Sequence, residues 1–452
     1  MCDRLAQTEG CPELVEGAAT PNWPDKSGNY NTMELITAKY VLPIEGEAIE
    51  NGAIVTELGK IIAVGGVAEL QEKHPGAKTE KNPNCVLLPG LVNAHTHLDL
   101  SGAFNFSSRE TIPDYIDWLL TILNHRNRTP IRDTIIQVQS AVSALINAGT
   151  TCVGDMTCFE GMFNILGEMG VRAVLFNEIY AGAGEAAQDR FETAIGLAEK
   201  YLDCGNDLIT PGLGPFAPYL LSRNLLTIIA QHAKDMDIPL QIHAAESFTE
   251  MEFFYDSKGS IATTLFPAIG WQDDLPPPHH KTPIQFLGEI GFLESSPSVV
   301  GGLHLGIRDF TTIARNMCRS VYCPRTNHFL GHGMFPFGKL REHGIPIGLG
   351  TDTLNGANSI TLWDEMRFIS ETAIMPIPTA REILQMATIG GARALSLEHI
   401  TGSLTAGKAA DYILIDLPEC PTANLIYDAV IRHTKPVNVR KVVIAGEILK
   451  TS

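Results

Sequence analysis

Short apolar segments alternate with stretches of helical periodicity through the middle of the chain, and this alternation constrains the fold more than any other feature. It is typical of α/β proteins with parallel strands. Runs such as 131–147 and 225–236 predict the intervening helices. Eight segments predict buried strands: 86–93, 150–155, 172–177, 209–213, 240–243, 299–304, 320–323 and 346–350. Eight strand–helix units predict a (β/α)8 TIM barrel over residues 86–401. The alternative is a doubly wound open sheet, but no Gly-x-Gly-x-x-Gly follows the first strand.

Both ends of the chain contain short strand-like segments. Residues 33–85 and 402–452 are β-rich and carry glycine turns, which predicts a small β-sandwich domain built from both chain termini. Residues 1–32 are rich in Gly, Pro, Asn and Thr and lack periodicity, so we expect a disordered segment or an extra N-terminal extension. Met33 opens the first strand-like segment and is an alternative start of the protein.

The net charge and the cysteines narrow the choice of partner and compartment. A formal charge of -18 argues against nucleic acid, whose phosphates attract a basic surface. No apolar run approaches the roughly 18 residues that span a membrane, and the first residues do not resemble a signal peptide. The nine cysteines are scattered without a Cys-x-x-Cys pair, which disfavours a disulfide framework. We therefore expect a cytoplasmic protein that acts on a small molecule, and its oligomeric state stays open, with a homodimer as one option.

Polar side chains that bind metals or move protons follow four of the predicted strands. In a barrel the carboxyl ends of the strands converge on one mouth, where active sites lie. A His-x-His pair places both imidazoles on the same face of a strand. The full set is His95 and His97 after the first strand, His243 and Glu246 after the fifth, His304 after the sixth, and Asp352 after the eighth.

These residue types suit a metal-dependent hydrolase. Three histidines and an aspartate can hold one divalent ion and leave a position for water, whose pKa the ion lowers towards ~7. Zn2+ suits these ligands, and Fe2+ and Mn2+ also accept histidine and carboxylate. Glu246 can take a proton from the water and deliver it to a ring nitrogen or leaving group. His304 can be a ligand or polarise the attacked atom, and Asp352 can bind the metal and accept the second proton of the nucleophile.

Each of these residues also has a purely structural explanation. His304 can be a hydrogen-bonded core histidine. Glu246 can be a solvated residue at a helix start, and Asp352 can be a helix N-cap. Their joint occurrence at the ends of successive strands favours the metal site.

Two motifs resemble the amidohydrolase superfamily. They are Leu-Pro-Gly-Leu-Val-Asn-Ala-His-Thr-His at 88–97 and Gly-Ser-Leu-Thr-Ala-Gly-Lys-Ala-Ala-Asp at 402–411. The resemblance runs from about Glu34 to the end and implies a metal-binding (β/α)8 barrel with a small β-sandwich from both chain ends. Two-metal branches carry a lysine at the end of the fourth strand, whereas 209–213 continues into Gly-Pro-Phe, so the resemblance implies the single-metal aminohydrolase branch. In that branch the metal ligands would be His95, His97, His243 and Asp352, with Glu246 as general acid/base and His304 assisting.

Within that branch the sequence is most similar to deaminases of adenine nucleosides. The segment 323–327, Cys-Pro-Arg-Thr-Asn, resembles a Cys-Pro-x-Ser-Asn motif after the seventh strand. Arg325 and the following Phe-Leu-Gly-His resemble the aminodeoxyfutalosine deaminases of menaquinone synthesis. Two positions depart from the pattern of related enzymes. Thr326 replaces the usual serine, and Phe216 replaces a histidine found in methylthioadenosine and S-adenosylhomocysteine deaminases.

The resemblance and the residues together predict a metal-dependent aminohydrolase. The expected substrate is a 6-aminopurine nucleoside-like heterocycle of the aminodeoxyfutalosine, methylthioadenosine or S-adenosylhomocysteine type, with release of ammonia. The alternative is hydrolytic dechlorination or dealkylamination of a triazine or pyrimidine ring. Glu246 favours deamination, because ammonia needs a proton to leave and chloride does not. A metal-bound barrel that only binds a partner is the non-enzymatic alternative, although such a protein needs no acid/base residue.

Other residues are weaker candidates for the pocket, and each has a structural alternative. An aromatic pair at this spacing can stack on a base or pack in the core. An arginine near the seventh strand can bind a substrate carboxylate or form a surface ion pair. The candidates are Tyr115 and Trp118 as the aromatic pair, Arg325 as the arginine, His328 and His332 near the mouth, and Asp155 and Glu178 as supports behind the catalytic residues.

Overall fold

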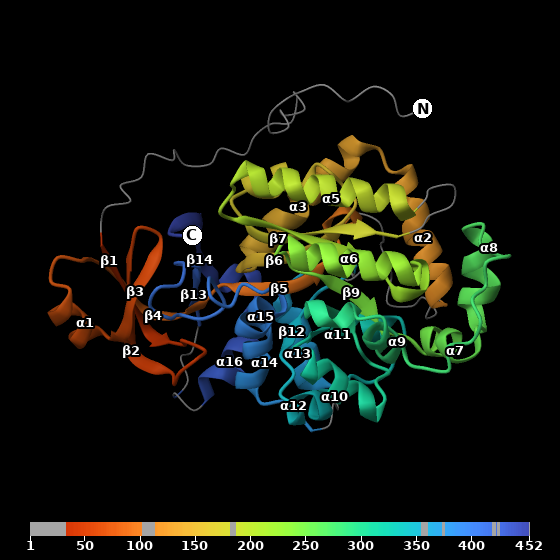
Figure 1. Cartoon of the computed structure of the whole chain (residues 1–452). Helices are drawn as coiled ribbons and strands as arrows, with labels where there is room; N and C mark the ends of the chain where they lie inside the picture. The colour runs from red at the N-terminus through yellow and green to blue at the C-terminus, as the bar shows by residue number, and fades with distance from the viewer. Residues whose placement is uncertain are drawn as a thin grey trace.

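The computed structural model describes residues 33–101, 114–180, 187–353, 360–372, 376–417, 422 and 425–451. The expected N-terminal extension, residues 1–32, lies outside the described residues. Figure 1 shows a sheet at one end of the molecule and a larger body of strands covered by helices.

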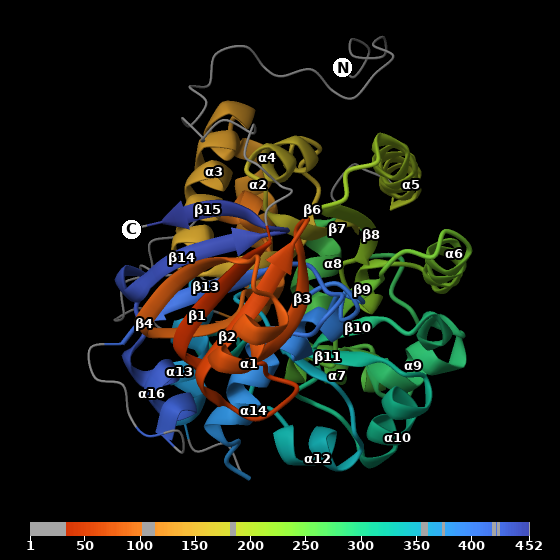
Figure 2. The ribbon, with the colours of Figure 1, turned by 90° about the vertical axis from the view of Figure 1, so that its left-hand side faces the viewer.

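Both ends of the chain contribute to one seven-stranded sheet, which faces the viewer in Figure 2. The strand order is β15-β14-β13-β4-β1-β2-β3. Strand β13 joins the C-terminal part to the N-terminal part, because it pairs antiparallel with β4. The strands are β1 (Glu34–Val41), β2 (Ile49–Glu57), β3 (Lys60–Gly66), β4 (Lys78–Pro89), β13 (Tyr412–Asp416), β14 (Val439–Ile444) and β15 (Glu447–Thr451).

The body of the molecule contains two four-stranded parallel sheets. A bridge between Leu213 and Leu240 connects β8 with the residue before β9, and a bridge between Thr96 and Asp352 connects β5 with the segment after β12. The eight strands therefore run parallel in chain order, and bridges join the two sheets at both edges. They are β5 (Leu91–Thr96), β6 (Thr150–Thr157), β7 (Arg172–Ile179) and β8 (Ile209–Pro215), then β9 (Gln241–Ala244), β10 (Ser298–Gly301), β11 (Arg319–Tyr322) and β12 (Ile347–Leu349).

Two predicted strands differ from the structure by three residues or more at an end, and the other six differ by one or two residues. The segment predicted at 86–93 is two strands, because the backbone changes partner at Gly90. The Gly90 N–H donates to the Asp411 carbonyl in the terminal sheet, and the Leu91 N–H donates to the Gly149 carbonyl beside β6. Residues 86–89 therefore belong to the terminal sheet, beyond the expected boundary at 85. The segment predicted at 299–304 ends at Gly301.

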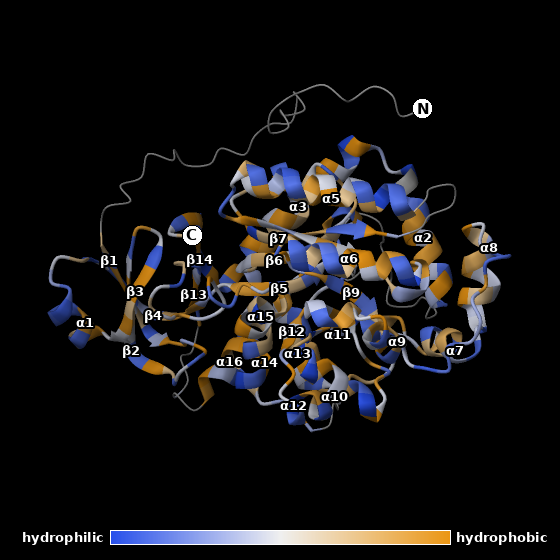
Figure 3. Cartoon of the chain, in the orientation of Figure 1, coloured by the Kyte–Doolittle hydropathy of each residue, from blue (hydrophilic) through white to orange (hydrophobic). Residues whose placement is uncertain are grey.

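Helices cover the two parallel sheets, and Figure 3 shows hydrophobic and hydrophilic residues alternating along them. In α3, Val138, Val142 and Leu145 are buried, and burial of each such side chain contributes about 1.5–3 kcal/mol. Among the described helices none has the length and apolar character needed to cross a membrane. The helices are α1 (Val67–Lys73), α2 (Tyr115–Arg128), α3 (Ile131–Asn147), α4 (Met162–Glu168), α5 (Ala187–Cys204), α6 (Arg223–Asp235), α7 (Phe248–Asp256), α8 (Phe266–Ala268), α9 (Pro283–Glu289), α10 (Ile307–Arg315), α11 (Pro324–Phe329), α12 (Phe337–Glu342), α13 (Leu362–Glu371), α14 (Ala380–Gln385), α15 (Gly391–Ala394) and α16 (Ile426–His433).

Candidate metal centre and catalytic cavity

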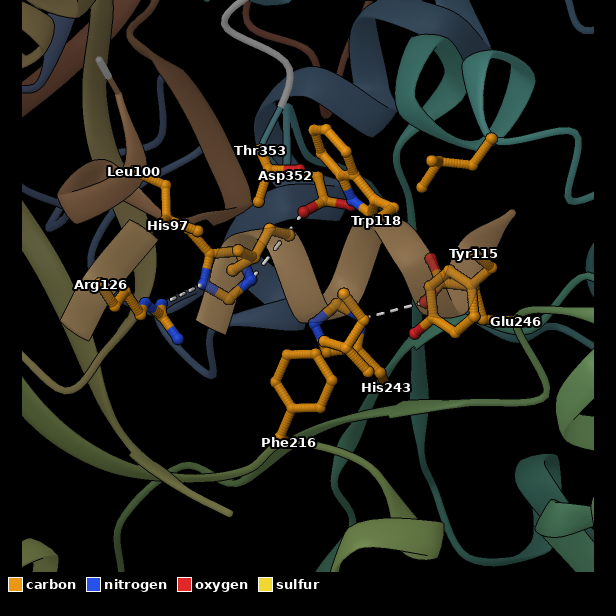
Figure 4. Close-up of a pocket in the computed structure, with 13 residues that line it drawn as sticks. His97, Leu100, Tyr115, Trp118, Arg126, Phe216, His243, Glu246, Asp352 and Thr353 are labelled. Atoms are coloured by element: carbon orange, nitrogen blue, oxygen red, sulfur yellow. Dashed lines mark hydrogen bonds and ion pairs between the residues drawn. The ribbon is translucent and has the colours of Figure 1, made fainter. Parts of the chain in front are cut away.

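Three histidines and one aspartate meet where β5, β9 and β12 end. The ligand nitrogens of His95, His97 and His243 lie within 4.8 Å of one another, and all three side chains are buried. Asp352 Oδ1 lies 3.9 Å from His95 Nε2 and 3.8 Å from His97 Nε2. Figure 4 shows His97, His243 and Asp352 directed towards the same cavity. The donor set and its spacing suit one divalent ion.

Hydrogen bonds on the far side of two rings fix which nitrogen faces the centre. His95 Nδ1 lies 2.6 Å from the side-chain oxygen of Gln241, and His97 Nδ1 lies 2.7 Å from the carbonyl oxygen of Met156. Both partners are acceptors, so each Nδ1 carries the proton and each Nε2 keeps its lone pair. His95 Nε2 and His243 Nε2 are buried and have no hydrogen-bond partner in the described part of the chain, as expected of atoms reserved for a metal.

Asp352 reaches the centre because its backbone is attached to β5. The N–H groups of Thr351 and Asp352 both donate to the His95 carbonyl at 3.0 Å. Asp352 has a φ of 53°, a left-handed conformation that is uncommon outside glycine and is found where a side chain must point in a set direction. Burial raises the pKa of its carboxyl to about 6. The N-cap of α13 is Thr361, so Asp352 does not cap that helix.

Glu246 follows β9 and lies beside the metal centre. One carboxylate oxygen, Oε2, is 3.3 Å from His243 Nδ1, and the other, Oε1, accepts a hydrogen bond of 2.9 Å from the Asn327 side chain. The Glu246 N–H donates to Glu250, which holds the backbone in place. Burial alone would raise the pKa of Glu246, but the neighbouring imidazoles of His243 and His332 outweigh it and hold the pKa below its usual range. Glu246 is therefore an ionised carboxylate that can accept a proton next to a metal.

A buried charged network lies behind His97. Arg126 donates to Asp99 at 2.8 Å, lies 2.7 Å from Glu178 Oε2, and has a guanidinium nitrogen 3.2 Å from His97 Nδ1. Asp155 accepts the N–H of Leu98 at 2.8 Å. Burial raises the pKa of both Asp155 and Glu178. The structure thus places these two acids, as expected, behind the ligands rather than in the cavity lining.

The cavity beside this centre has largely apolar and aromatic walls, and the space inside it and at its open mouth together amounts to about 380 Å³. Tyr115 and Trp118, for which the sequence left pocket and core alternatives open, both line it. Phe216 also lines it, with its ring 5.0 Å from that of His243. The described lining residues are His97, Leu100, Tyr115, Trp118, Leu119, Ile122, Arg126, Phe216, His243, Glu246, Leu330, Asp352 and Thr353. Such a surface suits a flat heterocycle held by stacking and oriented by a few polar groups.

Two other candidates lie away from the described cavity lining. His304 is half-buried, and its Nε2 lies 2.7 Å from the His332 carbonyl oxygen, to which it donates. Its expected assisting role therefore stays a prediction. The Arg325 guanidinium lies 3.6 Å from Glu365 and 3.9 Å from Asp364, so the structure favours the ion-pair alternative over a substrate carboxylate.

Sequence reasoning assigned no role to Gln241, Asn327 or Glu250, and left His332 without one. Gln241 is the first residue of the short strand β9. Nothing in its local sequence distinguishes it from other polar strand residues. Asn327 belongs to the Cys-Pro-Arg-Thr-Asn motif, which was the available signal for its contact with Glu246. His328, by contrast, is exposed, and its ring packs on Phe368 at 5.2 Å.

Comparisons with known proteins agree with this geometry. The model of the Amidohydrolase family matches residues 86–449. A 5-methylthioadenosine/S-adenosylhomocysteine deaminase of Moorella thermoacetica is 28% identical over 422 residues, which cover 90% of this chain and 92% of that protein. An aminodeoxyfutalosine deaminase of Deinococcus radiodurans is 28% identical over 371 residues, which cover 80% of this chain and 85% of that one. The solved structure of an adenosine deaminase from Xanthomonas campestris with bound zinc superposes with a TM-score of 0.80 at 24% identity, over 94% of each chain.

Proposed function

Because this chain belongs to the amidohydrolase family, we propose that it is a metal-dependent deaminase of a 6-aminopurine nucleoside. The observation that carries the proposal is the position of Glu246. An ionised, buried carboxylate stands within 3.3 Å of a histidine of the candidate metal centre and lines the same aromatic cavity. Loss of ammonia requires a proton donor at this position, and Glu246 can become one after it takes a proton from the attacking water.

The metal centre in this proposal consists of His95, His97, His243 and Asp352, and zinc is the proposed ion. The buried, unpaired nitrogens of His95 and His243 support it, as does the zinc in the adenosine deaminase that shares the fold. When bound, a divalent ion would supply the Lewis acidity that activates water at neutral pH. Fe2+ or Mn2+ would serve the same ligands.

Two residues of the chain carry out the proton transfers in this proposal. Glu246 accepts a proton from the attacking water and donates it to the ring nitrogen next to the carbon that carries the amino group. Asp352, whose pKa burial raises to about 6, accepts the second proton of the nucleophile and passes it to the amino group, which leaves as ammonia when the carbon–nitrogen bond breaks and the ring carbonyl forms. Tyr115, Trp118 and Phe216 hold the purine by stacking and exclude water.

The same proposal includes the architecture that carries the site. We infer that the two parallel sheets act as one (β/α)8 barrel, since bridges connect β8 with β9 and β5 with the end of β12. The terminal domain, for which we propose a small β-sandwich, is built on one seven-stranded sheet. The contact between β4 and β13 supports a domain shared by both ends.

The substrate is proposed to be an adenine nucleoside of the aminodeoxyfutalosine or methylthioadenosine type. The names of the relatives and the apolar cavity wall support this class. The test is ammonia release by the zinc-loaded protein from aminodeoxyfutalosine, methylthioadenosine, S-adenosylhomocysteine, adenosine, guanine and cytosine. We expect one adenine nucleoside to be strongly preferred and a chelator to abolish its turnover. If the metal-loaded protein releases no ammonia from any of these compounds, the proposal is overturned. Release of chloride or alkylamine from triazines and pyrimidines would then be the next activity to test.

A further inference from the structure

The carboxylate oxygen of Glu246 that does not face His243 meets two groups from one segment, residues 324–332. Asn327, in α11, donates to this oxygen at 2.9 Å. His332 approaches the same oxygen, with its Nδ1 at 3.6 Å, which is within ion-pair distance. The His332 side chain is 2% exposed, so no bulk water competes for this contact.

The backbone of His332 is fixed at both of its polar groups. Its N–H donates to the Asn327 carbonyl at 2.9 Å, and its carbonyl accepts from His304 Nε2 at 2.7 Å. The Tyr115 ring packs edge-on against the imidazole, with ring centres 4.9 Å apart. These three contacts hold the ring in one orientation towards Glu246.

Strand β10 packs closely against Glu246. It ends in Gly301, where a Cβ would lie 2.7 Å from the Cβ of Glu246, so only glycine allows the two backbones to approach. The next imidazole along the chain, His304, hydrogen-bonds the backbone of His332 instead of Glu246.

Only one nitrogen of the His332 imidazole has a hydrogen-bond partner among the described residues, namely Nδ1, which lies 3.5 Å from the Asn327 side-chain nitrogen. Its Nε2 is buried without a hydrogen-bond partner among the described residues, and its Nδ1 faces only Glu246 and the Asn327 side chain. A histidine retained for packing alone would have its nitrogens paired, because an unpaired buried polar atom costs free energy.

We propose that His332 is a positioning residue for Glu246, which it orients, together with Asn327, for proton transfer in the proposed deamination. This inference rests on the proposed function. Proton transfer from a misaligned carboxylate is slow even when the substrate is bound, because catalysis depends on reach and direction. We therefore expect that loss of His332 lowers kcat and leaves KM nearly unchanged.

The test compares three variants with the zinc-loaded wild type on its best nucleoside substrate. His332→Leu removes the ring nitrogens, and we expect kcat to fall about 10- to 100-fold with KM changed less than about 3-fold. His332→Asn keeps a side-chain N–H near the Nδ1 position, and we expect it to restore most of kcat. His328→Leu, at the exposed histidine of α11, is the matched control and should leave kcat unchanged.

A double-mutant cycle separates positioning from general damage. If His332 acts through Glu246, adding His332→Leu to Glu246→Gln should lower kcat no further. Zinc content and melting temperature of each variant show whether it is folded. A folded, zinc-loaded His332→Leu variant with wild-type kcat, or fully additive losses in the cycle, would overturn this inference and leave the proposed function intact. A zinc-loaded wild type that releases no ammonia from any substrate would overturn the proposed function and this inference with it.

Discussion

At the scale of single residues, the candidate metal centre depends on the hydrogen bonds that His95 and His97 form through Nδ1, the nitrogen that faces away from the centre. Gln241 accepts from His95 Nδ1 at 2.6 Å, and the Met156 carbonyl does the same for His97 at 2.7 Å. Such partners fix the tautomer and raise the basicity of the ligating nitrogen. Gln241 also donates to the Ala94 carbonyl at 3.0 Å, which holds its own side chain in place.

We therefore expect Gln241→Leu to weaken zinc binding about 10- to 100-fold, because His95 loses the acceptor that fixes its tautomer. Competition with a chromophoric chelator measures this change directly. Gln231→Leu, at an exposed glutamine of α6 whose side chain donates to Asp235, serves as the control and should leave zinc affinity unchanged. Equal zinc affinity for Gln241→Leu and wild type would show that His95 needs no such partner.

The sequence predicted the residue types at the centre better than it predicted their supports. His95, His97, His243, Glu246 and Asp352 lie at or just after the ends of strands, and parallel strands bring such ends together, so their meeting could be anticipated. Asn327 belongs to a recognisable motif, but the approach of His332 to Glu246 depends on the path of the chain after α11, which no local pattern specifies. His304 illustrates the same limit, because its direction is set by the loop beyond Gly301.

At the scale of elements, glycines decide where the predicted strands end. The apolar run 299–304 contains Gly301 and Gly302, whose φ values of 90° and 62° end β10 before His304. Gly90 separates β4 from β5, since the backbone changes its hydrogen-bond partner there. An added Cβ at this position would meet Thr151 Oγ1 at 2.0 Å, so only glycine fits. Hydropathy alone shows a continuous strand in both places, since glycine does not interrupt an apolar pattern. The helices follow from periodicity because one face of each is buried, and the remaining parallel strands follow from short apolar runs because they are buried on both faces.

At the scale of the whole molecule, a buried ion pair attaches the terminal sheet to the parallel strands. Arg172, the first residue of β7, donates to both carboxylate oxygens of Asp411 at 2.7 and 3.1 Å. The two residues are 239 positions apart, so no sequence pattern could reveal their contact. Asp411 also accepts the Ala445 N–H at 2.7 Å, which ties the end of β14 to the same point.

Arg172→Met should destabilise the protein by about 3–5 kcal/mol, because the Asp411 carboxylate would remain buried without its partner. The midpoint of chemical unfolding measures this loss. Arg432→Met provides the control, since Arg432 pairs with Asp428 at 2.8 Å on the surface and its removal should not shift the midpoint. Indistinguishable midpoints for the two variants would mean that the Arg172–Asp411 pair does not hold the sheet in place.

The proposed function depends above all on the position of the Glu246 carboxylate, which would lie beside a metal-activated water. Glu246→Gln is the most direct test, because it keeps the size of the side chain and removes its capacity to carry a proton. We predict a zinc content equal to that of the wild type and a loss of ammonia release of at least about 100-fold. A zinc-loaded Glu246→Gln variant that releases ammonia at close to the wild-type rate would contradict the account.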